Sequence, residues 1–290
     1  MINTTASDGK PIVPNFPVTP RPTDLTQRTP ASRAACVIIG DEILNGKTLD
    51  TNSHHLAGLL FRSGISLDKI EIVPDIEAEI VECVRRLSEP ESKFDLIFTS
   101  GGIGPTHDDI TYQSLAKVWD PAGELEYDAE TITRMDTYMS GRNSTAKLNP
   151  AQHEARRRMA LFPKMDREVL FVVPHLWVPV VQLRRRLFIL PGVPTLFTQL
   201  ADALVENYIP LPPKANQPHR QFVVTSLTES SIAPCLSRFA TQLAPAGIKL
   251  GSYPNFSSGQ VTISLIGPDF SQLSKAALEL EHQLEELYEN

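Results

Sequence analysis

Short apolar runs alternate with helix-like segments through the first two thirds of the chain. Ala35–Ile39 and Leu96–Phe98 are continuous apolar runs, and residues 69–73 alternate between apolar and charged side chains. Between these runs, apolar positions repeat at helical spacing in residues 52–62 and 76–87. Buried strands separated by helices are typical of a parallel sheet with right-handed crossovers. The pattern therefore predicts an α/β domain with a mostly parallel sheet.

Proline-rich stretches mark the expected domain limits. Proline recurs through residues 1–31 without apolar periodicity, which predicts a disordered tail. A second proline-rich stretch at 211–219 predicts a linker between a domain at 32–210 and a smaller one at 220–290. The large domain has further predicted strands at 169–173, 177–183 and 187–190, and further helices at 126–140, at 150–160 and after Pro194.

The last seventy or so residues follow the order strand, helix, strand, strand, helix. Val261, Ile263 and Leu265 alternate as in a strand with one buried face, and residues 273–287 repeat as an amphipathic helix. This pattern predicts a small α+β domain whose sheet is covered on one face by two helices.

Composition and charge narrow the class of partner. The 290 residues carry a formal net charge of -7, so we expect no extended basic surface for nucleic acid. No apolar run reaches the roughly 18 residues of a membrane span, and no apolar signal core opens the chain. Cys36, Cys83 and Cys235 lie far apart, which indicates reduced core residues. We expect a cytoplasmic protein, with a mitochondrial transit peptide as the alternative.

The stretch from Phe98 to Thr111 carries the clearest candidate chemistry. An apolar strand leads into a turn with three glycines and a proline, followed by two aspartates where a helix is expected to begin. Glycines let backbone N–H groups approach an anion, and a helix N-terminus favours negative charge. The alternative is an ordinary capped turn. The expected phosphate- or nucleotide-binding residues are Ser100, Gly101, Gly102, Gly104, Pro105, Thr106, Thr111, Gly192 and Asn52.

Acidic residues follow three of the predicted strands. Asp41 and Glu42 follow the first, Asp75 follows the second, and Asp108 and Asp109 follow the third. Carboxyl ends of parallel strands share one sheet edge, so these carboxylates are expected to converge. Their oxygens suit Mg²⁺, Mn²⁺ or Co²⁺. Asp75, Asp108 and Asp109 are the predicted metal ligands, and Asp41 or Glu42 would bind metal or act as a base. The alternatives are helix capping for Asp108 and Asp109 and solvated loop positions for Asp41 and Glu42.

Several motifs follow one another along the chain. They are Gly40-Asp41-Glu42-Ile43-Leu44-x-Gly46-x-Thr48-x-Asp50-Thr51-Asn52, Val73-Pro74-Asp75, Gly101-Gly102-Ile103-Gly104-Pro105-Thr106-His107-Asp108-Asp109-Ile110-Thr111, and Pro191-Gly192-Val193-Pro194. In this order they resemble the molybdopterin-binding (MoaB/Mog) superfamily. Within it the chain is most similar to CinA-type proteins and to the N-terminal molybdopterin-binding-like domain of eukaryotic FAD synthases. Ser231-Ile232-Ala233-Pro234 and Leu250-Gly251-Ser252-Tyr253-Pro254 are similar to the same FAD synthase region.

The resemblance implies a three-layer α/β/α domain of MoaB/Mog type with a nucleotide or pterin site at 32–210, followed by a small α+β domain. Asp75 and Asp109 match the functional acids of Mog-like members, with Asp41 and Glu42 as further catalytic candidates. In the CinA and FAD synthase branches this domain is associated with hydrolysis of ADP-ribose or FAD, aided by a divalent metal and potassium. Family members self-associate, so a homo-oligomer is expected.

Two departures from these relatives shape the expected function. The chain shows neither the adenylyltransferase domain of FAD synthases nor the amidase domain of CinA, so FAD synthesis by this chain is not expected. CinA proteins have a glycine-containing stretch where Val172–Pro179 has no glycine, which weakens the case for ADP-ribose. His175 and Trp177 are candidates for stacking on a ring, with simple packing as the alternative.

Three hypotheses for the function follow. The first is metal-dependent hydrolysis of a nucleotide pyrophosphate, FAD or ADP-ribose-like, that releases AMP. The second is a non-catalytic scaffold that binds a pterin or a nucleotide. The third is Mog-like transfer of an adenylyl group to molybdopterin.

Overall fold

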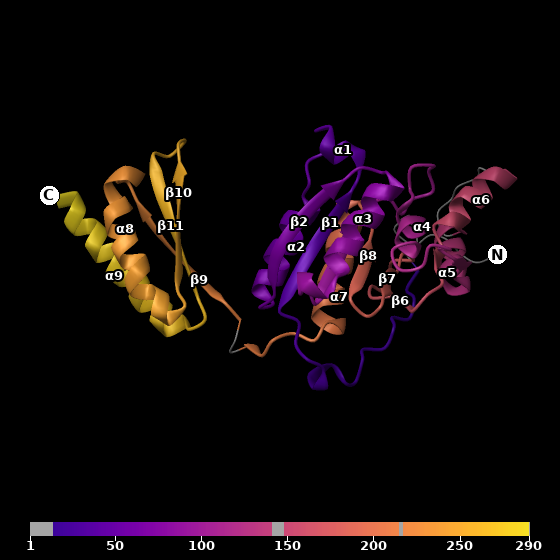
Figure 1. Cartoon of the computed structure of the whole chain (residues 1–290), viewed down its shortest axis with the longest axis horizontal. Helices are drawn as coiled ribbons and strands as arrows, with labels where there is room; N and C mark the ends of the chain where they lie inside the picture. The colour runs from indigo at the N-terminus through magenta and orange to yellow at the C-terminus, as the bar shows by residue number, and fades with distance from the viewer. Residues whose placement is uncertain (1–13, 141–147, 215–216, 290) are drawn as a thin grey trace, which may run out of the picture. The chain divides into compact units, whose positions relative to one another are not determined.

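Figure 1 shows the computed structural model, which describes residues 14–140, 148–214 and 217–289. The chain divides into two compact units. The first comprises Met1–Leu60 and Ile65–Leu211, and the second comprises Phe61–Gly64 and Pro212–Asn290. The main division thus falls one residue beyond the expected end of the large domain.

A six-stranded sheet in the order β2-β1-β3-β8-β7-β6 forms the centre of the first unit. Its strands are β1 (Arg33–Ile39), β2 (Ser66–Val73), β3 (Leu96–Ser100), β6 (Arg167–Leu170), β7 (Val180–Leu183) and β8 (Leu187–Leu190). The pairs β1–β2, β1–β3 and β3–β8 are parallel, whereas β7 pairs antiparallel with both β8 and β6. The predicted mostly parallel sheet is confirmed.

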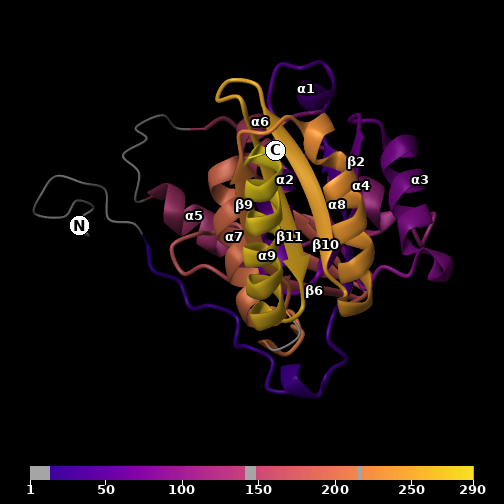
Figure 2. The same ribbon diagram turned by 90° about the vertical axis from the view of Figure 1, so that its left-hand side faces the viewer.

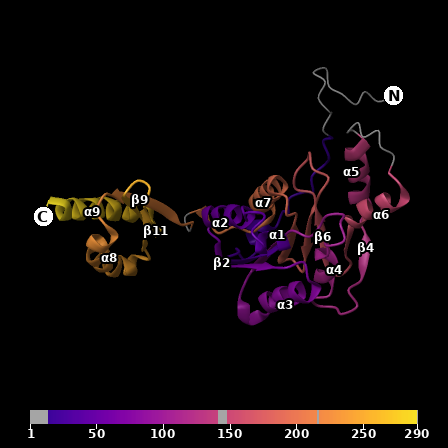
Figure 3. The ribbon, with the colours of Figure 1, turned by 90° about the horizontal axis from the view of Figure 1, so that it is seen from above.

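Helices α2 (Asn52–Arg62), α3 (Glu77–Ser88), α4 (Thr111–Ala116) and α7 (Pro194–Tyr208) cover the two faces of this sheet. The unit also contains α1 (Asp41–Leu44), α5 (Ala129–Ser140) and α6 (Pro150–Arg158). One core joins Phe98 and Phe188 of the sheet to Leu56 of α2 and Leu204 of α7. The other core lies on the opposite face, where α3 and α4 pack. Figure 3 shows the resulting three layers, with α2 and α7 on one side of the sheet and α3 and α4 on the other.

The sequence pattern missed two short strands, one of which overlaps the start of the helix predicted at 126–140, and it misplaced the bounds of others. Strands β4 (Leu125–Tyr127) and β5 (Leu161–Pro163) form a separate antiparallel pair. They are too short for a period of two to show. Strand β6 covers Arg167–Leu170 instead of the predicted 169–173. Strand β7 begins at Val180, three residues later than predicted, because Pro179 has no N–H to donate to a sheet.

Residues 14–31 correct the prediction of a disordered tail, while residues 1–13 lie outside the described residues. We call residues 14–31 the N-terminal strap. Thr19 N donates to Phe171 O (2.9 Å), Phe171 N donates to Thr19 Oγ1 (2.9 Å), and Tyr208 Oη donates to Thr19 O (2.5 Å). A proline-rich segment without apolar periodicity can still use its remaining N–H and C=O groups on a neighbour. Periodicity does not report such bonds.

Arg134 of α5 anchors the strap as well. Its Nη2 donates to Pro17 O at 2.7 Å, and its guanidinium lies 3.6 Å from the ring centroid of Phe171 and 5.3 Å from that of Phe16. Only 6% of Arg134 is exposed, and Glu130 balances its charge at 2.5 Å. The strap is therefore held by a buried cation between two aromatic rings.

The second unit has the order predicted from the sequence. Its elements are β9 (His219–Thr225), α8 (Glu229–Leu243), β10 (Lys249–Asn255), β11 (Gln260–Gly267) and α9 (Phe270–Glu289). The strands form an antiparallel sheet in the order β10-β11-β9. Figure 2 shows α8 and α9 side by side over this sheet, and their apolar residues share one core with Val223 and Ile263. The predicted small α+β unit is confirmed.

Two observations concern the whole described chain. Cys36, Cys83 and Cys235 are buried, one in each of the three cores. No helix in the described residues is long and apolar enough to cross a membrane.

Candidate functional site

The carboxyl ends of the four parallel strands lie together at one edge of the sheet. Ile39 of β1 pairs with Val73 of β2, and Ser100 of β3 pairs with Leu190 of β8. The segments that follow these strands are the ones that carry the predicted site residues. The topology therefore brings together motifs that are far apart in the sequence.

Two glycines allow these segments to pack backbone against backbone. Gly101 has φ = 112°, and a Cβ atom on it would lie 2.1 Å from Ile39 O. A Cβ atom on Gly192 would lie 3.2 Å from the Cα atom of Gly101. Gly101 has no room for a side chain and Gly192 has little, so the turns after β1, β3 and β8 meet at these glycines.

Asn52, at the start of α2, joins two of these turns. Its Nδ2 donates to Ser100 Oγ at 2.9 Å and to Gly192 O at 2.8 Å, and Asn52 is 7% exposed. The Asn52 side chain does not cap its own helix. That role belongs to Asp50, whose Oδ1 accepts from the N–H groups of Asn52 and Ser53 at 3.0 Å.

Thr111 and Asp109 brace the glycine-rich loop from inside. Thr111 Oγ1 donates to Gly101 O at 2.9 Å, and Thr111 is fully buried. Asp109 accepts Gly104 N on one oxygen at 2.6 Å, and accepts Thr106 N at 2.8 Å and Thr106 Oγ1 at 2.5 Å on the other. Helix α4 begins at Thr111, after both aspartates. Asp109 thus holds the shape of the loop with both of its oxygens.

The first part of the loop keeps donors for a ligand. Gly102 and Ile103 are half-buried, and in the described part of the chain their N–H groups donate to no acceptor. Adjacent N–H groups without acceptors in a glycine turn form an anion-binding concavity. The phosphate site predicted for this loop accordingly has its free donors at residues 102 and 103.

Asp75 links the segments that follow β1 and β2. Its Oδ2 accepts the N–H of Asp41 at 3.0 Å. Burial raises the pKa of Asp75, and the negative charges of Asp41, Glu42 and Asp108 raise it further, against the lowering effect of that hydrogen bond. The Glu42 carboxylate folds over Gly40, where an added Cβ would lie 2.6 Å from it. The ends of β1 and β2 therefore meet at Asp75, and the convergence of all the predicted carboxylates stays a prediction.

The same carboxylates can supply only part of the coordination shell of a divalent cation. Within the described residues, no group of three or more His, Cys, Asp or Glu side chains is arranged to hold a metal ion by itself. Mg²⁺ is commonly bound by only one or two carboxylates, with water and substrate phosphates completing its shell. Asp75 and Asp108 fit that arrangement as hard oxygen donors, and Asp108 is 59% exposed. Asp109 fits it less well because loop donors occupy its oxygens.

A small cleft lies beside the loop and contains residues that the sequence interpretation did not single out. Thr48, Asp50 and Thr51 line it together with the predicted Glu42, Asn52, Ser100 and Gly192. The signal was present, because these three residues belong to the motif that runs from Gly40 to Asn52. Pro105, Thr106 and the neighbouring His107 are exposed at the tip of the loop.

The stretch at 172–179 lies outside this arrangement. His175 Nε2 is 2.6 Å from Gln199 Oε1 of α7, and Leu176 is buried in the core. Neither His175 nor Trp177 lines the cleft. The side-chain packing of this stretch thus favours the structural alternative.

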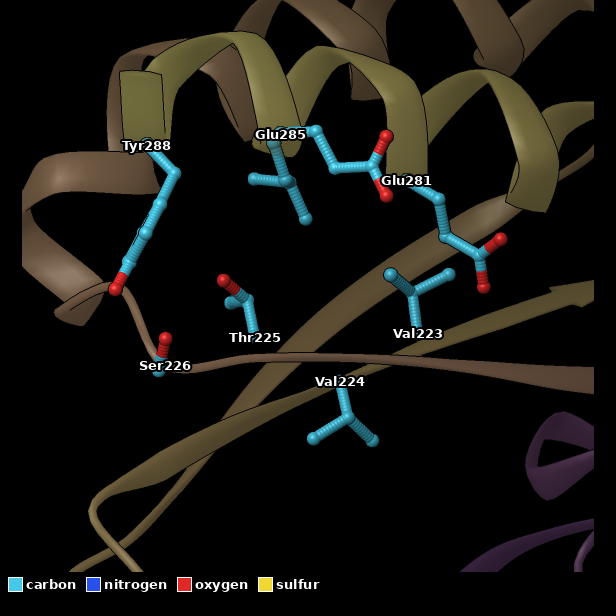
Figure 4. Close-up of a pocket in the computed structure, with 8 residues that line it drawn as sticks. Val223, Val224, Thr225, Ser226, Glu281, Glu285 and Tyr288 are labelled. Atoms are coloured by element: carbon cyan, nitrogen blue, oxygen red, sulfur yellow. The ribbon is translucent and has the colours of Figure 1, made fainter. Parts of the chain in front are cut away.

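The second unit contains a different, open cavity of about 520 Å³. Figure 4 shows Glu281, Glu285 and Tyr288 of α9 on one side and Thr225 and Ser226 at the end of β9 on the other. Val223 points toward the helix and Val224 away from it. This cavity has neither a glycine turn nor a group of converging strand ends, so the candidate site remains at the sheet edge of the first unit.

Comparison with protein families assigns both units. Residues 35–211 match the model described as a probable molybdopterin binding domain. Residues 217–289 match the model described as the middle domain of FAD synthase.

Curated relatives give the same result. A probable FAD synthase of Caenorhabditis briggsae is 32% identical over 244 residues, which are 79% of this chain and 45% of that protein. A CinA-like protein of Citrifermentans bemidjiense is 29% identical over 254 residues, which are 87% of this chain and 58% of that protein. The chain thus spans about half the length of these relatives.

A solved structure agrees with the fold of the first unit. The protein CinA from Thermoplasma acidophilum superposes with a TM-score of 0.50 at 28% identity, covering 61% of this chain and 97% of that one. Together with the glycine turns and the acidic strand ends, these matches show that the chain belongs to the molybdopterin-binding MoaB/Mog family, with a CinA-like first unit and a FAD synthase middle domain as its second.

Proposed function

We propose that the first unit hydrolyses a nucleotide pyrophosphate of the FAD or ADP-ribose type and releases AMP. For FAD, water would attack one phosphorus, the bridging P–O bond would break, and FMN and AMP would leave. The observation that carries the proposal is that a half-buried carboxylate surrounded by negative charges, Asp75, lies beside a glycine turn that has free N–H donors. The names of the relatives, FAD synthase and CinA-like, support this substrate class.

The glycine turn would bind the negative charge of the substrate. The N–H groups of Gly102 and Ile103 would donate to phosphate oxygens, and Asn52 would keep the turn at Gly192 in register with Ser100. Donors that are already oriented stabilise developing charge without reorganisation. Since Asp109 fixes residues 104–106 from inside, the donors would be in place before the substrate arrives.

Asp75 would take the proton of the attacking water. A carboxylate whose pKa is raised by burial and by neighbouring negative charges is a stronger base than an ordinary aspartate. Asp75 and Asp108 would hold a divalent cation, Mg²⁺, Mn²⁺ or Co²⁺, and K⁺ would be a second cation. When bound, that cation would supply charge neutralisation for the phosphates and for the crowded carboxylates.

The test is a product assay on the full chain. FAD, ADP-ribose and NADH are each incubated with Mg²⁺, Mn²⁺ or Co²⁺, with and without K⁺, and the products are separated by chromatography. We expect AMP together with FMN from FAD. The proposal fails if none of the three substrates is cleaved with any of the metals.

The two other hypotheses predict different results in the same experiment. A scaffold binds FAD or a pterin in calorimetry while no product forms, and the occupied oxygens of Asp109 are the observation that favours it. A Mog-like transferase consumes ATP and yields an adenylylated pterin. Consumption of FAD without ATP therefore separates the hydrolase from both.

A further inference from the structure

A second cavity of about 280 Å³ lies in the first unit at the opposite edge of the sheet from the candidate site. Leu96, the first residue of β3, lines it, as do Phe188 of β8 and Tyr208 at the end of α7. The N-terminal strap supplies a wall through residues 28–31, where Ala31 N donates to Pro210 O at 2.8 Å. The cavity thus exists only because the strap is folded against the sheet.

Gln182 places an unused amide in this cavity. Gln182 of β7 lines the cavity beside its cross-strand partner Phe188 and is 9% exposed. Within the described residues its side chain makes no hydrogen bond. The amide lines the cavity, where a ligand with a complementary edge would bond to it in place of water.

The two carboxylates and two guanidiniums that line the cavity balance in formal charge, but one guanidinium has no bonded partner among the described residues. Asp24 is paired with Arg28, at 2.9 and 3.0 Å. One Asp95 oxygen accepts Ser32 N, Ser32 Oγ and Arg33 N at 2.8 to 3.0 Å. Arg185 lines the cavity but makes no hydrogen bond or ion pair in the described part of the chain. The Arg28 hydrogen bond mainly, and the Arg185 charge to a lesser degree, lower the pKa of Asp24.

We propose that this cavity binds a purine nucleoside monophosphate. The amide of Gln182 offers an acceptor and donors side by side, which complement the amino group and ring nitrogen at one edge of adenine. Leu96, Phe188 and Tyr208 provide apolar walls for the ring, and Arg185 lies at the rim to pair with the phosphate. The volume is close to the lower limit of about 300 Å³ for small-molecule pockets, which suits one ring system with a short anionic tail.

The experiment titrates AMP into the full chain by calorimetry, with a chelator present so that no divalent metal contributes. Gln182→Leu removes the amide and Arg185→Ala removes the cation. Each is expected to weaken AMP binding by about tenfold or more, as loss of a hydrogen bond to a charged or buried group does. Arg184→Ala is the matched control. It lies in the same turn, with φ = 50° against 57° for Arg185, but its guanidinium faces the Trp119 ring instead of the cavity.

Two further ligands separate the contribution of the adenine ring to binding from that of the phosphate. Adenosine is expected to bind more weakly than AMP by about the factor that Arg185→Ala costs, and inorganic phosphate alone is expected not to bind. The proposal is overturned if AMP does not bind. It is also overturned if AMP binds all three variants with the same affinity, because AMP would then bind outside this cavity. It is also overturned if adenosine binds as tightly as AMP, or if phosphate binds with the same dependence on Gln182 and Arg185.

Discussion

The carboxylate of Asp75 and the backbone N–H of Asp41 are joined by a 3.0 Å hydrogen bond that links the end of β2 to the end of β1. This bond favours the charged carboxylate, yet burial and the charges of Asp41, Glu42 and Asp108 raise the pKa of Asp75 above its usual value. The fold therefore places a carboxylate where burial and the neighbouring negative charges disfavour its charged form. Such an arrangement is typical of a group that binds a cation or accepts a proton.

Asp75→Asn should stabilise the fold and strongly lower turnover. Because the pKa of Asp75 is raised in the folded chain, the protein loses stability as the pH rises from the ordinary aspartate pKa of about 4 through the raised value. Asparagine has no charge and still accepts the Asp41 N–H. The variant should melt at a higher temperature than the parent at neutral pH, and the difference should vanish at acidic pH.

Thermal unfolding across this pH range and the FAD assay check the prediction. Glu79→Gln, at an exposed carboxylate of α3, should change neither quantity. Loss of a general base should lower turnover by about 100-fold or more. A variant that melts below the parent at neutral pH would contradict the prediction. It would show that the hydrogen bond of Asp75 stabilises the fold by more than its charge destabilises it.

Gly101→Ala should be strongly destabilising, because its Cβ would lie 2.1 Å from Ile39 O. Gly46→Ala is the matched control, since Gly46 also has a positive φ (75°) but has nothing within 4 Å of the added Cβ. The clash should cost about 1–3 kcal/mol beyond the control, as overpacking does in other cores. Chemical denaturation measures both variants. Equal losses would mean that the three turns can move apart.

Asn52→Ala should weaken both the fold and substrate binding. It leaves Ser100 Oγ and Gly192 O without their donor at a buried site, which should cost about 1–3 kcal/mol. The KM for the cleaved nucleotide should rise, because the turn at Gly192 would lose its link to β3. In Asn207→Ala, the lost bond lies within α7 itself, so the loss of stability should be smaller and KM should not change. An unchanged KM in Asn52→Ala would separate this side chain from the site.

Arg134→Ala should release the N-terminal strap. The guanidinium stacks on Phe171 and donates to Pro17 O, and losing both contacts should cost about 2 kcal/mol. Hydrogen exchange followed by mass spectrometry should show faster exchange at residues 14–31. Arg157→Ala removes an exposed guanidinium that lies 5.1 Å from the Tyr127 ring, and it should leave exchange of the strap unchanged. Slow exchange in Arg134→Ala would mean that the backbone bonds of Thr19 suffice.

The sequence predicted those features that depend on one segment at a time. The buried strands, the position of Asp75 at a strand end and the small second unit all follow from local periodicity and turn residues. The role of Asp109 could not be predicted in this way. Its carboxylate was expected to point to a metal, and whether it does so depends on the path of residues 104–106, which fold back onto it.

Contacts between segments far apart in the sequence could not be predicted either. Asn52 reads as a helix cap in the sequence, but the cap comes from Asp50 because β3 and β8 bring Ser100 and Gly192 within reach of the asparagine. The strap was missed for a similar reason. Its partners, Phe171 and Tyr208, are more than 150 positions away in the chain.

The strap also affects where the first unit can be cut for expression. The family match begins at residue 35, which would suggest starting a shortened protein there. Such a protein would lack Thr19 and Ala31, and it would expose the ring of Phe171 and the hydroxyl of Tyr208 to solvent. A soluble and stable fragment should therefore begin before residue 14, and a poorly behaved shorter one would say little about the domain itself.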